Sequence, residues 1–307
     1  MTQEFSGRVG FAVGTGRCGT TFLAEVAAQE THVAATHQRH DLSEAFHRYC
    51  KWYGLPVDDA GFVATEEAAI RADLETHAYS LESSGYLSLS LRELHARFDA
   101  RFALLVRRPD KVVSSYVRKG WYAEPYLRGD ASLPLGYQPG YKFHHFLGRI
   151  APQGDEFTAW NKMTQVGKLA WYWRTLNEAV LAQFEQLGGA GRIAKIEELD
   201  HAAYGDLARF LGFEPKISRA RFDALVQKKP NARRGAPPVS TWTTREAQEF
   251  ETQVAPLAER LGYEYRIDVL RAAEAATTSN LDAAQDSMKS PCTNLVRRWL
   301  SKKETAA

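Results

Sequence analysis

The 307-residue chain has few cysteines, no long apolar run and almost no net charge. Its three cysteines, at positions 18, 50 and 292, are far apart, so we expect neither a disulfide framework nor a CxxC zinc site. No stretch approaches the roughly 20 apolar residues of a membrane span, and the N-terminus lacks the apolar core of a signal peptide. The 39 basic and 37 acidic residues leave a formal charge of +2, which argues against nucleic acid as a partner. These absences predict a cytoplasmic protein.

What the sequence does contain is a phosphate-binding pattern near its beginning. Residues 14–21 read Gly-Thr-Gly-Arg-Cys-Gly-Thr-Thr, between an apolar run over Val9–Val13 and a helical pattern over 22–29. Strand, glycine-rich turn and helix together aim backbone N–H groups and a helix N-terminus at a phosphate. The segment matches the ATP-binding pattern G-x-x-x-x-G-K-[ST] except that Thr20 replaces the lysine, and its cation, Arg17, comes three residues earlier. No Asp/Glu set that would hold magnesium is evident beside it, so no metal is expected.

The distribution of apolar segments predicts an α/β fold. Three runs are typical of buried parallel strands, at Val9–Val13, Phe102–Val106 and Arg192–Ile196, and two weaker candidates are His32–Thr36 and Tyr86–Leu91. Helical patterns follow the clear strands at 22–29, 111–119 and 204–211, and a long apolar face runs from 166 to 187, before Gly188-Gly189. We expect a doubly wound, mostly parallel central sheet flanked by helices, with the ligand at the carboxyl ends of the strands.

The sequence predicts a single domain over residues 1–270. Within it, residues 116–159 are rich in aromatics without a clear period, which indicates an irregular insert. We expect this insert on the acceptor side of the site, and the alternative is a surface segment packed on itself. Residues 271–307 are expected to be a linker and a short cationic tail with Trp299. Such a tail can make weak contact with an anionic membrane surface, although a frayed end is the simpler interpretation. The oligomeric state is left open.

A second anion-binding element follows the strand over Phe102–Val106. Arg107 stands at the end of that strand, and Ser115 lies eight residues later on the next helix. A guanidinium fork and a hydroxyl that project from adjacent elements suit a phosphate. Two anion sites at one sheet edge indicate a nucleotide with phosphates at both ends of its ribose.

On these residues the chain resembles sulfotransferases that use 3′-phosphoadenosine 5′-phosphosulfate (PAPS). Their [KR]-[SA]-G-T-[TS] loop matches Arg17–Thr21, and their R-x7-S element matches Arg107 to Ser115. Looser matches are Glu82–Tyr86, Ile196–Leu199 with Phe210–Gly212, and Arg233–Gly235 followed by Trp242 and Leu261–Tyr263, so the resemblance spans about residues 8 to 265. It implies in-line transfer of a sulfuryl group to a hydroxyl of a small-molecule, carbohydrate or lipid-like acceptor.

The resemblance also implies roles for the matching residues. The loop would hold the 5′-phosphate through backbone N–H groups and two hydroxyls, from Gly16, Arg17, Cys18, Gly19, Thr20 and Thr21. Phe22 would stack on adenine, and Arg107 and Ser115 would hold the 3′-phosphate, with Arg234 and Gly235 closing over it. Arg17 would neutralise the charge that develops on the bridging oxygen as the sulfuryl group leaves.

The base that takes the acceptor's proton is assigned less directly. His37 is the first choice, because it follows a candidate strand and should approach the same edge of the sheet. Many related proteins have a glutamate around this position, and this chain departs from them with Gln38, which cannot act as a base. Glu82 and Glu44 are the alternatives. The histidines, including the His144-His145 pair, do not form a convincing zinc pattern.

Two other functions remain open from the sequence. A P-loop kinase or nucleotide hydrolase would share the loop, although Thr20 at the lysine position and the Arg107/Ser115 pair argue against it. A non-catalytic nucleotide-binding protein of the same fold would retain both anion sites without transferring a group. Magnesium-dependent ATP turnover would favour the first, and nucleotide binding without transfer the second.

Overall fold

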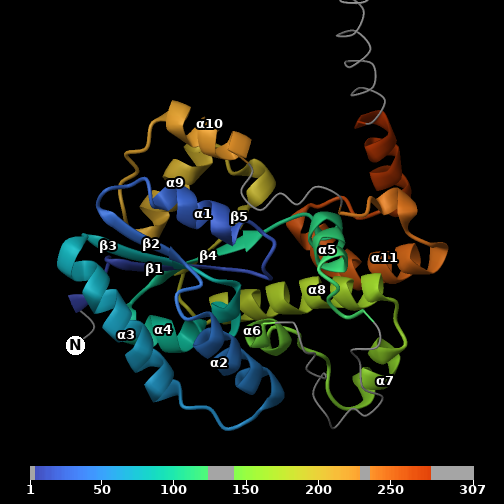
Figure 1. The fold of residues 1–307 in the computed structure, drawn as a ribbon, viewed down its shortest axis with the longest axis horizontal. Helices are drawn as coiled ribbons and strands as arrows, with labels where there is room; N and C mark the ends of the chain where they lie inside the picture. Colours follow the sequence, from blue (N-terminus) through green and yellow to red (C-terminus); the bar gives the residue numbers. More distant parts are fainter. Residues whose placement is uncertain (1–3, 124–141, 229–235, 278–307) are drawn as a thin grey trace, which may run out of the picture.

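A five-stranded parallel sheet forms the centre of the computed structural model, which describes residues 4–123, 142–228 and 236–277 (Figure 1). The strand order is β2-β3-β1-β4-β5. The strands are β1 (Val9–Val13), β2 (Val33–His37), β3 (Tyr79–Ser83), β4 (Arg101–Val106) and β5 (Gly191–Lys195). The first strand is therefore central, with two strands on either side of it, which confirms the predicted α/β fold.

Helices cover both faces of the sheet. On one face lie α1 (Thr20–Ala27), α9 (His201–Leu211) and α10 (Arg219–Lys228), and on the other α2 (Asp41–Tyr53), α3 (Asp59–Thr76), α4 (Leu91–Phe98) and α8 (Gln165–Phe184) (Figure 1). The remaining helices are α5 (Pro109–Arg118), α6 (Phe143–Leu147), α7 (Asp155–Asn161) and α11 (Thr244–Leu261), with short 3₁₀ turns η2 (Gly85–Leu89), η3 (Ile196–Glu198) and η4 (Val239–Thr241). Two separate apolar clusters, one for each face, form the core.

The central strands are apolar because both of their faces are covered. Every residue of β1 is buried, and β4 is buried after its first residue. They pair in parallel, with Phe11 beside Phe102 and the two rings stacked at 5.6 Å between centroids. Continuous apolar runs of this kind are typical of parallel strands between helical layers, and this is why the sequence identified both strands.

The sequence prediction was wrong at Tyr86–Leu91, which is not a strand. Residues 85–89 form the 3₁₀ turn η2, and the third strand is β3, which reads Tyr-Ser-Leu-Glu-Ser. Its polar side chains are buried and find partners inside the protein: Ser80 Oγ donates to Asp73 Oδ2 at 2.6 Å, and Ser83 Oγ donates to the Thr20 carbonyl at 2.9 Å. Because these partners come from other elements, the local pattern concealed the strand.

Other predicted boundaries shift by a few residues. The helices predicted at 22–29, 111–119 and 204–211 begin at Thr20, Pro109 and His201. The predicted irregular insert contains two short helices, α6 and α7, and its residues 124–141 lie outside the described part of the chain. Residues 267–277 are helical, so helical structure continues past residue 270, where we predicted a linker. In the described residues, no helix combines the length and apolar character needed to cross a membrane.

Candidate functional site

The turn between β1 and α1 has the backbone geometry of an anion site. Gly16, Arg17 and Gly19 have positive φ angles of 76°, 59° and 105°. A Cβ at Gly16 would lie 2.5 Å from the Tyr116 hydroxyl oxygen, so the turn needs glycine there. Gly19 is the N-cap of α1 and offers no side chain to cap the first turn. The N–H groups of that turn and the positive end of the helix dipole are therefore suited to an anion.

Buried hydroxyls from three elements, α5, α8 and β3, hold this loop in place. Tyr116 of α5 donates to the Thr15 carbonyl at 2.7 Å, and Tyr172 of α8 donates to the same oxygen at 3.3 Å. Ser83 at the end of β3 donates to the Thr20 carbonyl. The loop is thus fixed by side chains that the sequence analysis did not assign to the site.

The two predicted phosphate-binding elements meet at one edge of the sheet. Arg17 Nε donates to Ser115 Oγ at 2.8 Å, and Arg107 Nη1 donates to the Arg17 carbonyl at 3.1 Å. Arg107 itself follows β4, and its carbonyl accepts the indole N–H of Trp173 at 3.0 Å. The arginine–serine pair and the loop are therefore adjacent, as one shared nucleotide would require.

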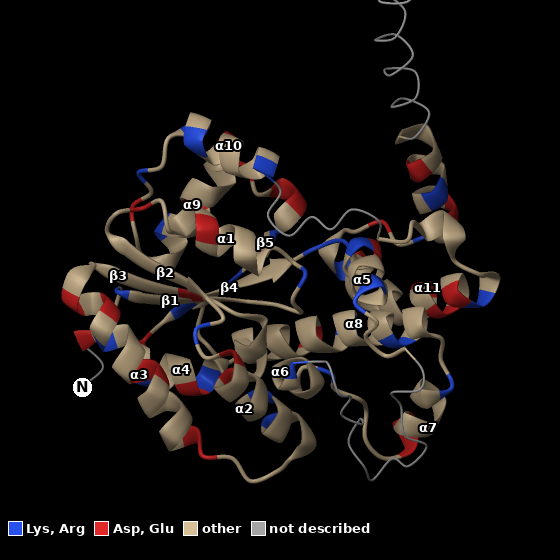
Figure 2. Ribbon diagram, in the orientation of Figure 1, with Lys and Arg blue, Asp and Glu red and all other residues tan. Residues whose placement is uncertain are grey.

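A cavity of about 210 Å³ opens beside the loop. Its lining comes from seven different parts of the fold: Thr15, Gly16, Arg17, Thr20, Thr21, His37, Gln38, Arg48, Gly85, Tyr86, Tyr116, Lys119, Trp121, His145 and Tyr172. Three cations and two imidazoles line it, and none of these residues is Asp or Glu. Acidic and basic residues are interspersed over the ribbon as a whole (Figure 2), so this excess of positive charge is local. We refer to this cavity as the pocket.

The volume of the pocket limits what fits inside it. Pockets that enclose a whole small molecule are about 300–1,000 Å³. The smaller pocket here suits a phosphate-sized anion with the reacting group beside it, and leaves a nucleoside to extend beyond its walls.

His37, predicted as the base, lies at the end of β2 and faces the loop. Its Nε2 is 3.2 Å from both the Thr20 and the Thr21 hydroxyl oxygens. Partial burial and the nearby Lys119 ammonium lower the pKa of His37 below its usual value. A neutral imidazole at this position is therefore hydrogen-bonded to the two threonines predicted to contact the phosphate.

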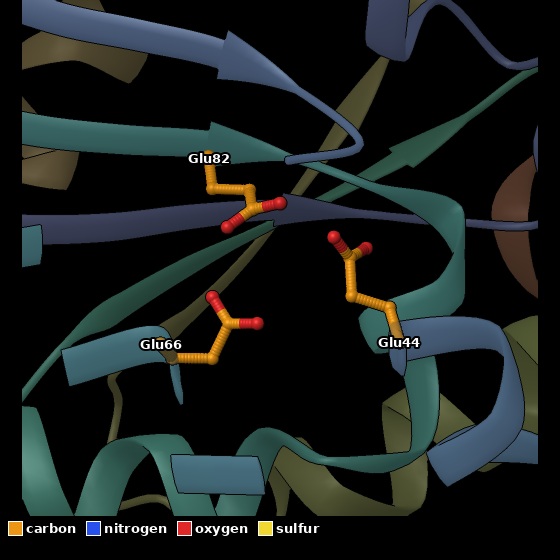
Figure 3. A group of neighbouring side chains, drawn as sticks. All are labelled: Glu44, Glu66 and Glu82. Carbon is orange, nitrogen blue, oxygen red and sulfur yellow. The ribbon is translucent and has the colours of Figure 1, made fainter. Parts of the chain in front are cut away.

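The two predicted alternatives, Glu82 and Glu44, do not line the pocket. With Glu66 of α3 they form a buried group, the carboxyl cluster, in which oxygens of the three side chains lie within 4.8 Å of one another (Figure 3). Glu82 Oε1 accepts the Arg39 N–H at 2.9 Å, and Glu44 Oε1 accepts the His40 N–H at 2.7 Å. The cluster thus holds the turn that follows His37.

Burial sets the protonation of the carboxyl cluster. It raises the pKa of Glu82 and of Glu66 to about 7, and raises the pKa of Glu44 as well, and the like charges of the neighbouring carboxyls add to the effect. Arg39 is the cation beside the cluster, with Nε 3.5 Å from Glu82 Oε2, and it also pairs with Asp73 at 2.6 Å. The three carboxyls therefore retain protons near neutral pH and titrate as a coupled group.

The other predicted site residues are placed as follows. The Cys18 side chain is buried in the core under α1, and that burial raises the pKa of its thiol. Phe22 does not line the pocket and packs edge-on against Phe222 of α10, with 5.8 Å between ring centroids. Arg234 and Gly235 lie outside the described residues.

Arg48 and Lys119 line the pocket but were not identified from the sequence. Arg48 is 1% exposed, donates to the carbonyls of Gly85 and Gly148 at 3.0 and 2.9 Å, and lies 4.8 Å from the Tyr86 ring centroid. Nothing in the local pattern of α2 distinguishes it. Lys119 follows Ser115 by four residues at the end of α5, so helical periodicity does place it on the Ser115 face.

Comparison with known proteins identifies the fold. No family model matches the sequence, and no curated protein matches it. Among solved structures, the crystal structure of sulfotransferase STF9 from Mycobacterium avium aligns with a TM-score of 0.54 at 13% identity, over 84% of this chain and 78% of that one. The described part of the chain therefore has the fold of a sulfotransferase.

Proposed function

We propose that this protein is a PAPS-dependent sulfotransferase that transfers a sulfuryl group to a hydroxyl of a small-molecule, carbohydrate or lipid-like acceptor. The observation that carries the proposal is the contact of Arg17 with Ser115 at 2.8 Å. It joins the phosphate loop to the arginine–serine pair, and a nucleotide that carries phosphates on both its 5′ and 3′ sides needs both elements at one edge. The fold shared with a sulfotransferase supports the same assignment.

The residues present fit the donor's two anionic ends. The open first turn of α1, the positive-φ loop and the Thr20 and Thr21 hydroxyls suit the 5′-phosphosulfate. Arg107 and Ser115 suit the 3′-phosphate, because a guanidinium and a hydroxyl give charge-assisted hydrogen bonds to its oxygens. The donor supplies the sulfuryl group, and these residues orient it.

The chemistry asked of the protein is orientation and stabilisation of charge. In-line transfer requires the acceptor oxygen to approach opposite the leaving phosphate oxygen. Arg17 lines the pocket and carries the loop's cation, so its guanidinium would stabilise the negative charge that grows on that leaving oxygen. A sulfuryl group carries less charge than a phosphoryl group, which is consistent with a pocket lined by cations and no carboxylates.

Isothermal titration calorimetry with three nucleotides tests this proposal. We expect 3′,5′-ADP to bind at least about tenfold more tightly than 5′-AMP, because a hydrogen-bonded ion pair with the 3′-phosphate contributes about 1.5–3 kcal/mol. The Arg107→Ala variant should lose this preference and bind both nucleotides similarly. Equal affinity of the wild-type protein for 3′,5′-ADP and 5′-AMP would contradict the proposal.

An ATP titration with and without magnesium addresses the kinase or hydrolase alternative. That alternative needs the lysine that Thr20 replaces and an acidic ligand for magnesium, whereas the carboxyl cluster is buried away from the pocket. Magnesium-dependent release of phosphate from ATP would favour it. Binding of 3′,5′-ADP without turnover of PAPS would instead favour a non-catalytic protein of this fold.

A further inference from the structure

The pocket contains two histidines that come from different walls. His37 lies at the end of β2 beside the loop, and His145 lies on α6. A base for the attacking hydroxyl must be unprotonated, and it must have a ring nitrogen available to the acceptor. The two imidazoles differ in whether a ring nitrogen is already hydrogen-bonded to the protein.

His37 already uses one of its two ring nitrogens. Its Nε2 lies 3.2 Å from the hydroxyls of Thr20 and Thr21, both at the start of α1. The tautomer of the ring decides which group donates, but in either case this nitrogen is engaged with the loop and is not open to an acceptor molecule. The contacts of His37 are therefore those of a residue that orients the phosphate loop.

His145 is half-buried, and no hydrogen bond to its ring occurs among the described residues. Its ring lies edge-on to His144, with 4.4 Å between centroids, and His144 Nδ1 in turn lies 3.2 Å from Asp41 Oδ2. The two neighbouring histidines therefore make different contacts: His144 is paired with a carboxylate from α2, while His145 lines the pocket.

The surroundings keep His145 neutral. Burial, the adjacent His144, Lys119 at the end of α5 and Lys142 before α6 lower its pKa to about 4, and Asp41 from α2 opposes them. Such a ring is unprotonated at neutral pH. The negative charges of a bound donor would oppose the lysines and raise this pKa towards the range in which an imidazole is an effective base.

We propose that His145 is the base of the sulfuryl transfer and that His37 orients the Thr20 and Thr21 hydroxyls; this inference rests on the proposed function. As the acceptor oxygen forms its bond to sulfur, its proton passes to a ring nitrogen of His145. The bond between sulfur and the bridging oxygen breaks, and its electron pair stays on that oxygen, which leaves as part of 3′,5′-ADP. The proton is then released from His145 to solvent.

Three glutamine variants test the assignment: His145→Gln, His37→Gln and, as a neighbouring control outside the pocket lining, His144→Gln. Calorimetry with 3′,5′-ADP measures binding, and chromatography measures the release of 3′,5′-ADP from PAPS with water and with 2-naphthol as acceptors. Thermal melts confirm that each variant is folded.

We expect His145→Gln to bind 3′,5′-ADP within about twofold of the wild-type protein and to release it from PAPS at least about a hundredfold more slowly, since glutamine cannot take the proton. His37→Gln should weaken 3′,5′-ADP binding by about three- to tenfold, the effect of a lost hydrogen bond. His144→Gln should retain more than about a fifth of the turnover.

The outcomes separate the two proposals. Wild-type turnover in folded His145→Gln would overturn the assignment of the base and leave the proposed function standing. Equal losses of binding and turnover in His145→Gln would also overturn it, because His145 would then act on the nucleotide. If the wild-type protein binds 3′,5′-ADP but turns over no PAPS with either acceptor, there is no sulfuryl transfer for a base to assist, and the assignment of His145 is overturned. Failure to bind 3′,5′-ADP would contradict the proposed function itself.

Discussion

Two polar regions lie at the carboxyl ends of β2 and β3, and they differ in charge and in exposure. The pocket is lined by Arg17, Arg48 and Lys119, whereas the carboxyl cluster is buried and has Arg39 as its adjacent cation. The turn after His37 connects them, because its next backbone N–H groups, at residues 39 and 40, bind the cluster. The comparison indicates that the pocket is organised to attract an anion, whereas the adjoining carboxyl cluster is organised to hold protons.

The largest expected effect follows from removing the loop's cation. Arg17→Ala should reduce the release of 3′,5′-ADP from PAPS by about a hundred- to thousandfold, the usual cost of removing one donor that stabilises developing charge. Stopped assays of the purified variant measure it. Arg17→Lys is the matched control and should retain most of the activity, since it keeps a cation on the loop. Unchanged turnover in Arg17→Ala would show that the pocket's positive charge does not act on the leaving oxygen.

The second prediction concerns the stored protons. Glu66 has a pKa of about 7 in the folded protein, above its ordinary value of 4.5, so the folded state binds more protons between these limits. Its contribution to stability is therefore complete below about pH 4.5 and is lost as the pH rises through 7. Glu66→Gln removes this titration. Relative to the wild-type protein, the variant should gain on the order of 1–3 kcal/mol of unfolding free energy between pH 5 and pH 8.

Urea unfolding at the two pH values measures that gain, and the neighbouring residue provides a control of opposite sign. Glu67 is paired with Arg97 and Arg71, which lower its pKa. Its contribution is present above the ordinary pKa and is lost as the pH falls, so Glu67→Gln should cost slightly more stability at pH 8 than at pH 5. If Glu66→Gln followed the same direction as Glu67→Gln, the carboxyl cluster would not hold protons at neutral pH.

The sequence analysis predicted the features that short segments of the chain determine on their own. The Gly14–Gly19 loop, Arg107 and Ser115 were identified because a strand, a turn and a helix fix their spacing over a few residues. β1 and β4 were identified because burial on both faces requires continuous apolar runs. In these regions, short-range pattern and tertiary position give the same answer.

The rest depends on contacts between distant segments. The carboxyl cluster joins α2, α3 and β3, and its partners include backbone N–H groups that no pattern reveals. β3 was misplaced for the same reason, because Glu82 and Ser83 are buried polar residues whose hydrogen-bond partners are distant in the sequence. Arg48 and His145 enter the pocket from α2 and α6, so their role follows from how those helices pack and not from their neighbours in sequence.

The smallest predicted effect concerns the buried hydroxyls that hold the loop. It tests whether they contribute to the binding of an anion in the pocket. Tyr116→Phe removes the hydroxyl of a buried side chain, which donates to the Thr15 carbonyl at 2.7 Å. Tyr172 also donates to that carbonyl, at 3.3 Å, so the oxygen keeps one partner. A net hydrogen bond contributes about 0.5–1.5 kcal/mol, and we expect calorimetry to show about three- to tenfold weaker 3′,5′-ADP binding.

Tyr122→Phe removes a comparable buried hydrogen bond, to the Ile150 carbonyl away from the loop, and should leave that affinity unchanged. Equal weakening in both variants would mean that the loop responds to general loss of packing, whereas a loss confined to Tyr116→Phe would show that the carbonyl contact itself holds the loop in its anion-binding shape.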